Sequence, residues 1–379
     1  MKKIKDGIAA ILYKIILLSV KLLPSGSGEK HLLLIKNDEI GDYILFRNYL
    51  QTIRNHEKYG SYKITLIGNI IWKDLFDSFD STLVNDVFWL NKKLFQKDLK
   101  YRFNFLKKIR TTGFSDVINC IYSRHVSVDD CFVEIINCKQ KMGMVSDISN
   151  QKRDKKIYTR LIDAGDKLLF DLFRNSNFIS QALDINQATL NPSVHFKDVR
   201  ITYNSEPAYC VVFAGAGKQS KKWPPEYFAD IIKYISTKYN LNVYLGGGPG
   251  DIADSNAVKE IISVPVIDLT GKLTMSESLS LLKSAKFALS VDTGSVHMAA
   301  GVLCPVIALY SGIHYRRFAP YPKEVFNKFY YIYCDEVDNM IHERSPKLSD
   351  PSDLTYTLIR KIPPSKVIPY IDNILQNKI

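Results

Sequence analysis

The sequence predicts an α/β protein built from two Rossmann-like domains that face a central cleft. At 379 residues the chain is too long for one typical hydrophobic core and indicates two domains of roughly 150 to 200 residues each. Its 46% hydrophobic and 24% charged residues are ordinary for a folded protein. Short runs rich in Leu, Ile and Val alternate with charged, periodic stretches, and this alternation starts twice. Such a rhythm is typical of parallel sheets covered by helices.

Residues 1–30 predict an amphipathic helix followed by a linker. Lys3, Lys14 and Lys21 share one helical face, and the rest is filled by apolar residues: Ile8, Ile11, Leu12, Ile15 and Leu22. The apolar run is too short and too charged to span a bilayer, and the pattern favours a helix lying on an anionic membrane surface. A helix packed on the protein body and a signal peptide are the alternatives, and the missing A-x-A site argues against the second.

Residues 31–190 predict an N-terminal Rossmann-like domain. Its strand candidates are "HLLLI", "KITLIG", "VNDVFWL" and "FSDVINCIY". The stretch 180–207 is polar, carries Pro192 and Pro207, and lacks a long apolar period, so we expect the domain boundary there.

Residues 206–345 predict a C-terminal Rossmann-like domain, and residues 346–379 predict a C-terminal helical segment. The strand candidates are "AYCVVFAGAG", "NVYLGGG", "VPVIDLT", "KFALSVD" and "CPVIALY", and the helix candidates are 225–239, 251–262, 276–285 and 364–376. Ligands of such sheets bind at the carboxyl ends of the strands, so we expect the site in the cleft where these ends meet.

The bulk composition narrows the classes of partner. A formal net charge of +12 favours anionic partners, but no nucleic-acid-binding motif is present and no nucleic acid is expected. The six cysteines form no C-x-x-C pair and the seven histidines form no ligand pair. We therefore expect a reducing cytoplasm, no bound metal and no cofactor.

The motif Asp292-Thr293-Gly294-Ser295 spells an aspartic protease signature. Such a protease needs two of these carboxylates on a β-rich fold, whereas here a single copy ends a strand of an α/β pattern. A glycine at a strand-to-helix turn leaves backbone N–H groups free to bind phosphate, and His297 lies in the first turn of the helix. A capped core helix with a buried histidine is the alternative.

Two further glycine-rich turns follow strands of the second domain. In "LGGGPGD", Asp251 has the character of a ribose-binding carboxylate. In "FAGAGKQSKKWPPEYFA", Lys218, Lys221 and Lys222 are suited to neutralise a diphosphate. Val212 and Gln219 stand where a P-loop needs Gly and Ser or Thr, which excludes that motif. Taken alone, the first loop is better explained as a plain turn, and the lysines of the second are equally well explained as solvated surface charge.

In the first domain, "LLLIKNDEIGDYILFRNYL" places Lys36, Asp38, Glu39 and Asp42 in one strand-to-helix loop. A carboxylate at this edge of a sheet is a candidate general base toward a hydroxyl group. The alternative is an ordinary acidic residue in the first turn of a helix.

Together these loops resemble glycosyltransferase family 9, the bacterial heptosyltransferases of lipopolysaccharide assembly. The matching pieces are "IKNDEIGD", "GAGKQSKKWPPEYFA", "GGGPGD" and "IDLTGKLTMSESLSLLKSAKFALSVDTGSVHMAAGVLCPVIALYSG". They span roughly residues 32 to 312, with gaps in the first domain. The resemblance implies a GT-B fold and an inverting, metal-independent transfer of a sugar, heptose by expectation, from a nucleotide-diphosphate donor such as ADP-heptose to a sugar hydroxyl of a glycolipid.

The resemblance also implies roles for individual residues. Asp42 matches the catalytic base. The positions matching donor-binding residues are Lys221 at the diphosphate, Asp251 at the ribose, Leu273 at the adenine, Asp292 at the donor sugar, the turn Thr293, Gly294 and Ser295 at the phosphates, and His297 at the helix start. Asp251 stands where Glu is more usual.

Acceptor contacts are expected from Lys36, Asp38 and Glu39, and from Arg124 and His125 after "FSDVINCIY". Asp38 and Glu39 replace the small or hydroxyl residues of well-known members, so either carboxylate could share the role of the base. The resemblance makes residues 31–190 the acceptor domain and residues 206–345 the nucleotide-sugar donor domain. The expected partners are a nucleotide-sugar donor, a lipid-linked saccharide acceptor and the anionic inner leaflet, with the protein cytoplasmic and peripheral at the inner face of the membrane. A non-catalytic binding paralogue and a nucleotide-sugar epimerase of the same fold remain open at this point.

Overall fold

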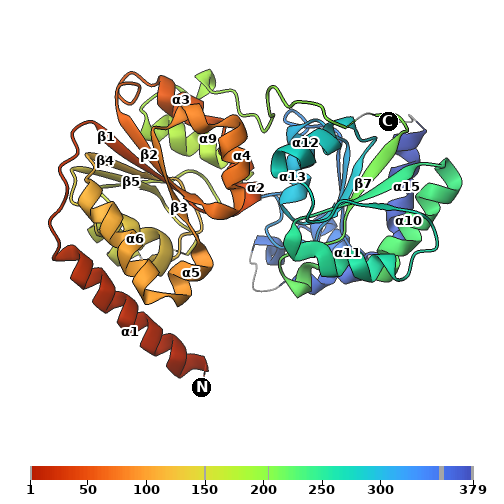
Figure 1. The fold of residues 1–379 in the computed structure, drawn as a ribbon, viewed down its shortest axis with the longest axis horizontal. Helices are drawn as coiled ribbons and strands as arrows, with labels where there is room; N and C mark the ends of the chain where they lie inside the picture. Colours follow the sequence, from red (N-terminus) through yellow and green to blue (C-terminus); the bar gives the residue numbers. More distant parts are fainter. Residues whose placement is uncertain (1, 149–150, 204, 350–353, 377–379) are drawn as a thin grey trace. The chain divides into compact units, whose positions relative to one another are not determined.

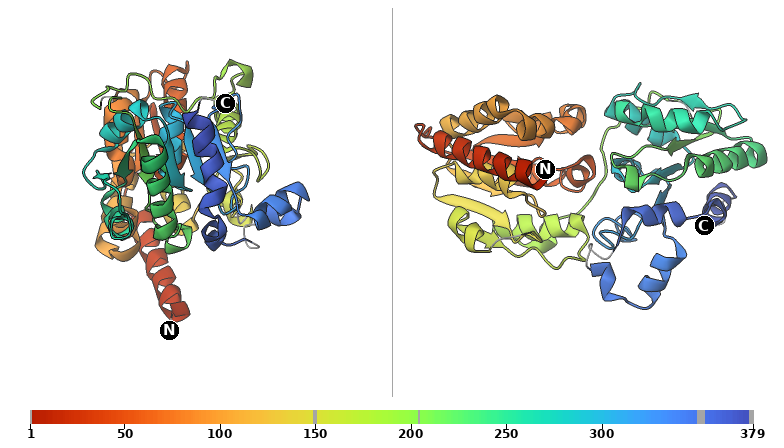
Figure 2. Two further views of the ribbon diagram at one scale, coloured as in Figure 1. Left: turned by 90° about the vertical axis from the view of Figure 1, so that its right-hand side faces the viewer. Right: turned by 90° about the horizontal axis from the view of Figure 1, so that it is seen from below.

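The computed structural model describes residues 2–148, 151–203, 205–349 and 354–376, which fold into two compact units. The first unit consists of Met1–Gly165 and Phe173–Asn191, and the second of Asp166–Leu172 and Pro192–Ile379. The chain therefore passes between the units three times. In both units, helices cover the two faces of a parallel sheet (Figures 1 and 2).

The first unit contains a six-stranded sheet with the order β3-β2-β1-β4-β5-β6. Its strands are β1 (His31–Lys36), β2 (Lys63–Asn69), β3 (Asp86–Leu90), β4 (Asp116–Asn119), β5 (Gln140–Met144) and β6 (Arg160–Ile162). All neighbours are parallel, and Leu34 lies opposite Leu66 on one side and Ile118 on the other. Strand β1 is buried along its whole length, which explains the apolar run from Leu32 to Ile35 at its centre.

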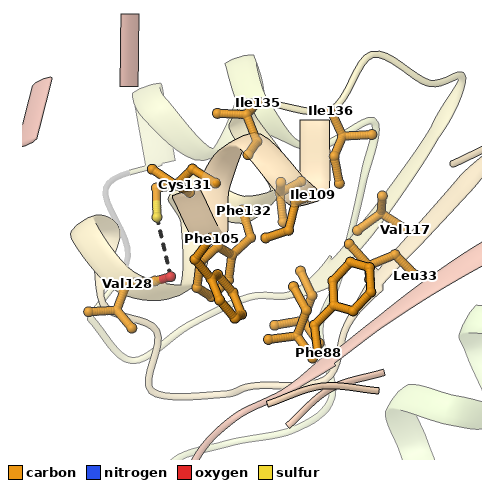
Figure 3. Packing of buried hydrophobic residues seen from close by; sticks show 14 of the residues in the cluster. Leu33, Phe88, Phe105, Ile109, Val117, Val128, Cys131, Phe132, Ile135 and Ile136 are labelled. Carbon is orange, nitrogen blue, oxygen red and sulfur yellow. Dashed lines mark hydrogen bonds between the residues drawn. The ribbon is translucent and has the colours of Figure 1, made fainter. Parts of the chain in front are cut away.

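The helices of the first unit pack on this sheet through large apolar side chains. They are α1 (Lys2–Lys21), α2 (Ile40–Ile44), α3 (Tyr49–Asn55), α4 (Lys73–Phe79), α5 (Lys92–Lys97), α6 (Leu99–Thr112), α7 (Cys131–Glu134), α8 (Gln151–Ile157) and α9 (Asp171–Ala182). Figure 3 shows Leu33, Phe88 and Val117 of the strands beside Phe105 and Ile109 of α6. This core fixes the sheet whose carboxyl edge carries the predicted acceptor loop.

Helix α1 packs lengthwise on α6. Val20 is fully buried in the core of the first unit. Lys21 Nζ lies 2.8 Å from Glu134 Oε1, and Arg110 donates to the carbonyl oxygens of Lys21 and Leu23 at 3.2 and 3.1 Å. The helix therefore docks on the protein body along one side, as one of the sequence alternatives describes.

The opposite side of α1, continued by Leu22 directly after the helix, carries a row of exposed apolar residues, which we call the outer seam. Its members recur at alternating intervals of three and four residues and are 53% to 87% exposed: Ile8, Ile11, Ile15, Leu18 and Leu22. Among the helices that the structure describes, none is long and apolar enough to cross a membrane.

The second unit repeats the topology of the first, with the strand order β12-β11-β10-β7-β8-β9. Its strands are β7 (Tyr209–Phe213), β8 (Asn242–Gly246), β9 (Ile267–Asp268), β10 (Ala288–Val291), β11 (Val306–Leu309) and β12 (Phe329–Ile332). Its helices are α10 (Pro225–Tyr239), α11 (Ile252–Lys259), α12 (Met275–Ser284), α13 (Gly294–Gly301), α14 (Asp335–His342) and α15 (Pro364–Leu375). All strand pairs are parallel. The prediction of two Rossmann-like α/β domains is thus confirmed.

A segment from the first half of the sequence completes the core of the second unit. Within Asp166–Leu172, the carboxylate of Asp171 lies 3.1 Å from Arg317 Nε, and the backbone N–H of Asp171 donates to the Arg317 carbonyl at 2.9 Å. Phe170 meets the ring of Tyr321 edge to face, with centroids 4.8 Å apart. Both partners of the ion pair are largely buried, with 9% and 8% of their side chains exposed.

Candidate active site

The carboxyl ends of β7 and β10 lie side by side where the strand order of the second unit reverses, the position at which α/β sheets bind ligands. The turn η5 (Gln219–Lys221) follows β7 and ends at Lys221. Lys221 Nζ lies 3.0 Å from Asp292 Oδ2 and donates to the Asp292 carbonyl at 3.3 Å. Two residues predicted from separate motifs therefore form one ion pair at this edge.

The turn from Asp292 into α13 keeps backbone donors available. Thr293 precedes the helix in an extended conformation, and its hydroxyl does not cap the helix. Instead, Ser295 Oγ lies 2.7 Å from both Thr293 Oγ1 and Ser290 Oγ. Within the described parts of the chain, the N–H groups of Gly294 and Ser295 have no acceptor. A helix start of this kind attracts anions through its N–H groups and its dipole.

His297 lies in the same helix but is buried, with only 4% of its surface exposed. Its Nδ1 lies 2.5 Å from the hydroxyl oxygen of Tyr321. Burial lowers the pKa of His297 to about 4, although the nearby Asp292 and Asp171 act in the opposite direction. The imidazole is therefore neutral at physiological pH. It adds a polar group beside the start of α13 but no positive charge.

Asp251 belongs to the turn η6 (Pro249–Asp251) after β8, and its carboxylate accepts the backbone N–H of Gly248 at 2.8 Å. Its side chain lies so close to Gly215 that a Cβ there would fall 2.3 Å from three Asp251 atoms. Only glycine fits at this position, and the loops after β7 and β8 are thereby held together. The predicted adenine contact, Leu273, is half-buried between β9 and α12.

Tyr356 was not anticipated from the sequence. It begins the turn η9 (Tyr356–Lys361), and its ring lies 4.6 Å from Lys221 Nζ and 5.2 Å from Lys218 Nζ. Trp223 Nε1 fastens the same segment by donating to the Ile362 carbonyl at 2.9 Å. The family resemblance stops near residue 312, so no motif pointed to this aromatic cover over the lysines.

In the first unit, the loop after β1 is held from several sides. Lys36 Nζ lies 2.8 Å from Asp38 Oδ2 and donates to the Cys120 carbonyl at 3.3 Å. The Asp38 carbonyl accepts from the side chains of Asn69 and Trp72 at 3.1 and 3.2 Å. Asp42 is half-buried in the first turn of α2. The loop is thus rigidly placed at the carboxyl edge of the sheet.

The carboxylates of this loop influence one another. Burial and the negative charge of Asp42 raise the pKa of Asp38 to about 7, against the opposing effect of Lys36. Glu39 is exposed, and its carboxylate lies 3.2 Å from Lys92 Nζ. The loop therefore offers one carboxyl group that titrates near neutrality beside Asp42.

Asn37 and Asp129 connect this loop to the turn after β4. The Asn37 amide donates to Asp129 Oδ1 at 2.9 Å, and the His125 backbone N–H donates to Asp129 Oδ2 at 2.7 Å. Asn37 and Asp129 are both buried. Asn37 lies within the motif "IKNDEIGD" without a predicted role, and Asp129 belongs to no motif of the sequence analysis. The side chain of His125 is exposed, and its contact with an acceptor stays a prediction.

Arg124, the other predicted acceptor contact, has a different place. Its side chain is 1% exposed, with Nε 2.9 Å from Asp130 Oδ1 and one terminal nitrogen 2.9 Å from Asp154 Oδ2. The remaining terminal nitrogen donates to the Met144 carbonyl. Since all three nitrogens of the guanidinium are hydrogen-bonded inside the unit, Arg124 forms a buried crosslink. Its expected contact with an acceptor stays a prediction.

Across the ranges that the structure describes, no three His, Cys, Asp or Glu side chains are grouped as metal ligands. The chemistry that the two edges do offer is an anion site with Lys221 and helix N–H groups in the second unit, and a set of carboxylates in the first.

Known proteins share this fold. The structure is similar to that of a family 9 glycosyl transferase from Veillonella parvula, with a TM-score of 0.68 at 16% identity over 93% of this chain and 99% of that chain. It is also similar to E. coli heptosyltransferase WaaC with ADP, with a TM-score of 0.64 at 14% identity over 91% and 99% of the two chains. E. coli ADP-heptose lps heptosyltransferase II matches with a TM-score of 0.64 at 14% identity over 92% and 99%. No curated protein sequence matches the chain.

The model of glycosyltransferase family 9 (heptosyltransferase) matches residues 131–335. This range includes Lys221, Asp292 and the start of α13, and the GT-B fold implied by the sequence is confirmed by the structural matches. Because the match covers more than half of the 379 residues, the chain belongs to glycosyltransferase family 9 and is a glycosyltransferase.

Proposed function

We propose that the protein transfers a sugar, heptose by expectation, from an ADP-linked donor to a sugar hydroxyl of lipopolysaccharide or a related glycolipid. The observation that carries the proposal is the Lys221–Asp292 ion pair beside the N–H groups of Gly294 and Ser295. ADP and ADP-2-deoxy-2-fluoro heptose are the ligands of the E. coli WaaC structures, which favours ADP as the nucleotide here.

On the donor side, Lys221 and the start of α13 would hold the diphosphate. As the bond between the anomeric carbon and the diphosphate oxygen breaks, its electron pair stays on the diphosphate, and these fixed positive groups stabilise the growing charge. They take the part that a divalent cation plays in other transferases, so we propose that the reaction needs no metal. Asp292 would then accept a hydrogen bond from a hydroxyl group of the donor sugar, and Asp251 would accept one from a ribose hydroxyl. Leu273 would pack on the adenine.

On the acceptor side, Asp42 would act as the general base. It takes the proton of the acceptor hydroxyl while that oxygen attacks the anomeric carbon on the face opposite the diphosphate, which inverts the configuration there. Lys36, Asp38, Glu39 and His125 lie at the same edge of the first unit and are the proposed acceptor contacts.

The outer seam of α1 would place the enzyme on the membrane that carries its acceptor. In the sequence of the helix, Lys14 and Lys21 alternate with the apolar residues of the outer seam. Lys2, Lys3 and Lys5 precede them, and Asp6 is the single acid. Apolar burial and attraction to anionic lipid would therefore act together at the inner leaflet.

Donor binding is tested by titrating ADP into the protein by calorimetry in the presence of EDTA. Lys221→Met is expected to weaken ADP binding about 10- to 100-fold, since a hydrogen bond to a charged group contributes about 1.5–3 kcal/mol. The matched control is Lys259→Met, because Lys259 also pairs with an aspartate, at 2.6 Å from Asp268, but on an exposed helix. Binding of UDP or GDP in place of ADP would overturn the nucleotide assignment, and EDTA-sensitive binding would overturn metal independence.

Membrane attachment is tested with phosphatidylglycerol vesicles in a sedimentation assay. The double change Ile11→Ser and Leu18→Ser removes two half-exposed side chains of the outer seam and is expected to weaken vesicle binding by about 10-fold or more, from the apolar area lost. Ile252→Ser with Ile261→Ser is the control, because these residues are comparably exposed on the second unit. Equal losses in both double variants would count against a membrane role for α1.

A further inference from the structure

A hollow of about 590 Å³ lies between α1 and the body of the first unit, and we call it the α1 hollow. Its apolar wall includes Ala9, Tyr13 and Leu17 of α1 and Val126 and Cys131 of the body. The volume falls in the range of small-molecule sites, roughly 300–1,000 Å³. It lies on the side of α1 that faces the protein and is thus distinct from the outer seam.

Small residues on α1 keep the hollow open. At the carboxyl end of the helix, Val20 is fully buried against the core of the unit. Two to three turns earlier, Ala9 and Ala10 border the hollow with methyl groups. A helix packed on a protein surface normally buries larger side chains along its whole apolar stripe, so this part of α1 leaves room for another apolar group.

Arg102 brings a buried positive charge to the hollow. Only 2% of the residue is exposed, and its guanidinium lies between the rings of Tyr13 and Phe95, 3.8 and 4.3 Å from their centroids. It donates to the carbonyl oxygens of Phe95 and Ser127, whereas the buried Nε has no acceptor. Among the residues that the structure describes, no carboxylate pairs with it. A buried charge without a counter-ion is costly, and an anion in the hollow would compensate it.

The other charged side chains around the hollow are also mostly positive. Lys14, Arg102 and Arg153 line it together with one acid, Glu134. Glu134 already pairs with Lys21 at 2.8 Å and with Arg153 at 2.9 Å, so its charge is neutralised. The lining is therefore apolar with a net positive charge, which suits a ligand with a hydrocarbon part and an anionic group.

We propose that the α1 hollow binds one acyl chain of an anionic amphiphile, with the anionic group paired to Arg102. Two sources share this chemistry: a phospholipid of the membrane under the outer seam, and the lipid part of the acceptor. The second source rests on the proposed function. It would place the lipid beside η3 (Val126–Asp130), whose Ser127 accepts from Arg102 and whose Asp129 holds Asn37 in the loop of the candidate base.

The test uses dodecyl phosphate as a soluble probe below its micelle concentration, added to the full-length protein and followed by calorimetry. Saturable binding of one probe per chain is expected, with dodecyltrimethylammonium of the same chain length and butyl phosphate of the same charge binding at least 10-fold more weakly. Ala10→Trp fills the hollow from its exposed rim and should abolish binding. Ala9→Leu should weaken it, and Arg102→Gln should remove the preference for phosphate over ammonium.

Two controls separate this site from the others. Ile11→Ser with Leu18→Ser alters only the outer seam and should bind dodecyl phosphate as the wild type does. ADP titration should be unchanged in Ala10→Trp, so a loss of the donor site is recognised independently of a loss of the hollow. Undiminished dodecyl phosphate binding in Ala10→Trp, or equal binding of the phosphate and ammonium probes, would overturn the proposal.

Steady-state kinetics distinguish the two sources of the acyl chain. If the hollow receives the acceptor lipid, Ala10→Trp raises KM for an acylated acceptor and leaves KM for its deacylated sugar unchanged. If it receives a membrane phospholipid, both KM values stay unchanged, and Ala10→Trp weakens sedimentation with phosphatidylglycerol vesicles.

Discussion

Replacing Asp42 with Asn is expected to lower kcat for sugar transfer by about 100- to 10,000-fold, the usual contribution of a general base. The amide keeps the size of the side chain and its place in the first turn of α2 but cannot take a proton. ADP binding should remain within about twofold of the wild type, because the proposed nucleotide contacts lie on the second unit. The measurement is single-turnover transfer paired with ADP calorimetry on the same preparation.

Asp38→Asn and Glu39→Gln are the matched variants, since both carboxylates belong to the same loop. Each should retain most of the wild-type kcat. Asp38→Asn should also shift the pH profile, because the pKa of Asp38 is raised to about 7 and its negative charge faces Asp42 only above that pH. A full loss of transfer in Asp38→Asn with full activity in Asp42→Asn would assign the base to Asp38 instead.

Arg124→Gln is expected to destabilise the first unit by about 3–5 kcal/mol, the cost of breaking a buried ion pair from one side. The change removes Arg124 from the carboxylates of Asp130 and Asp154, each 3% exposed. Asp130 then keeps only the more distant Arg153, at 3.9 Å. For a unit of this size the loss corresponds to roughly 10 °C in the melting temperature. Thermal unfolding followed by circular dichroism measures it directly.

Arg160→Gln provides the comparison, because Arg160 also pairs with an aspartate of the first unit, Asp184, but with side chains 44% and 78% exposed. Surface pairs contribute about 0–1 kcal/mol, so its melting temperature should change by no more than a few degrees. An unchanged melting temperature in Arg124→Gln, together with a raised acceptor KM, would contradict the crosslink and return Arg124 to the acceptor site.

Much of the fold is readable from local sequence. Helix α10 has its predicted bounds because a proline opens it and an apolar period of 3.6 residues runs through it, and Asn240 ends it in a left-handed conformation. Strands β5, β6 and β12 were not predicted. The segment "QKMGM" of β5 has few strand-forming residues, β6 pairs over only three residues, and β12 is an edge strand; each is set by its neighbours in the sheet.

The candidate site also has a part that the sequence predicts and a part that it does not. Lys221 and Asp292 are far apart in sequence, yet the strand order of a Rossmann-like sheet brings the ends of β7 and β10 together, so their meeting follows from the predicted fold. The side chain of Arg124 points into the unit because it pairs with Asp154. The position of Tyr356 depends on the hydrogen bond from Trp223 to Ile362. These are long-range contacts that no motif encodes, and they decide which residues reach a ligand.

The ion pair between Asp171 and Arg317 has a consequence for exchanging halves between family members. A gene cut anywhere between residues 190 and 206, where the sequence suggests a joint, would give the donor half Arg317 without Asp171 and Tyr321 without Phe170. A buried guanidinium would lose its carboxylate, and the tyrosine that contacts His297 would lose its aromatic neighbour. Chimeric enzymes of this family should therefore take residues 166–172 from the same parent as the donor half.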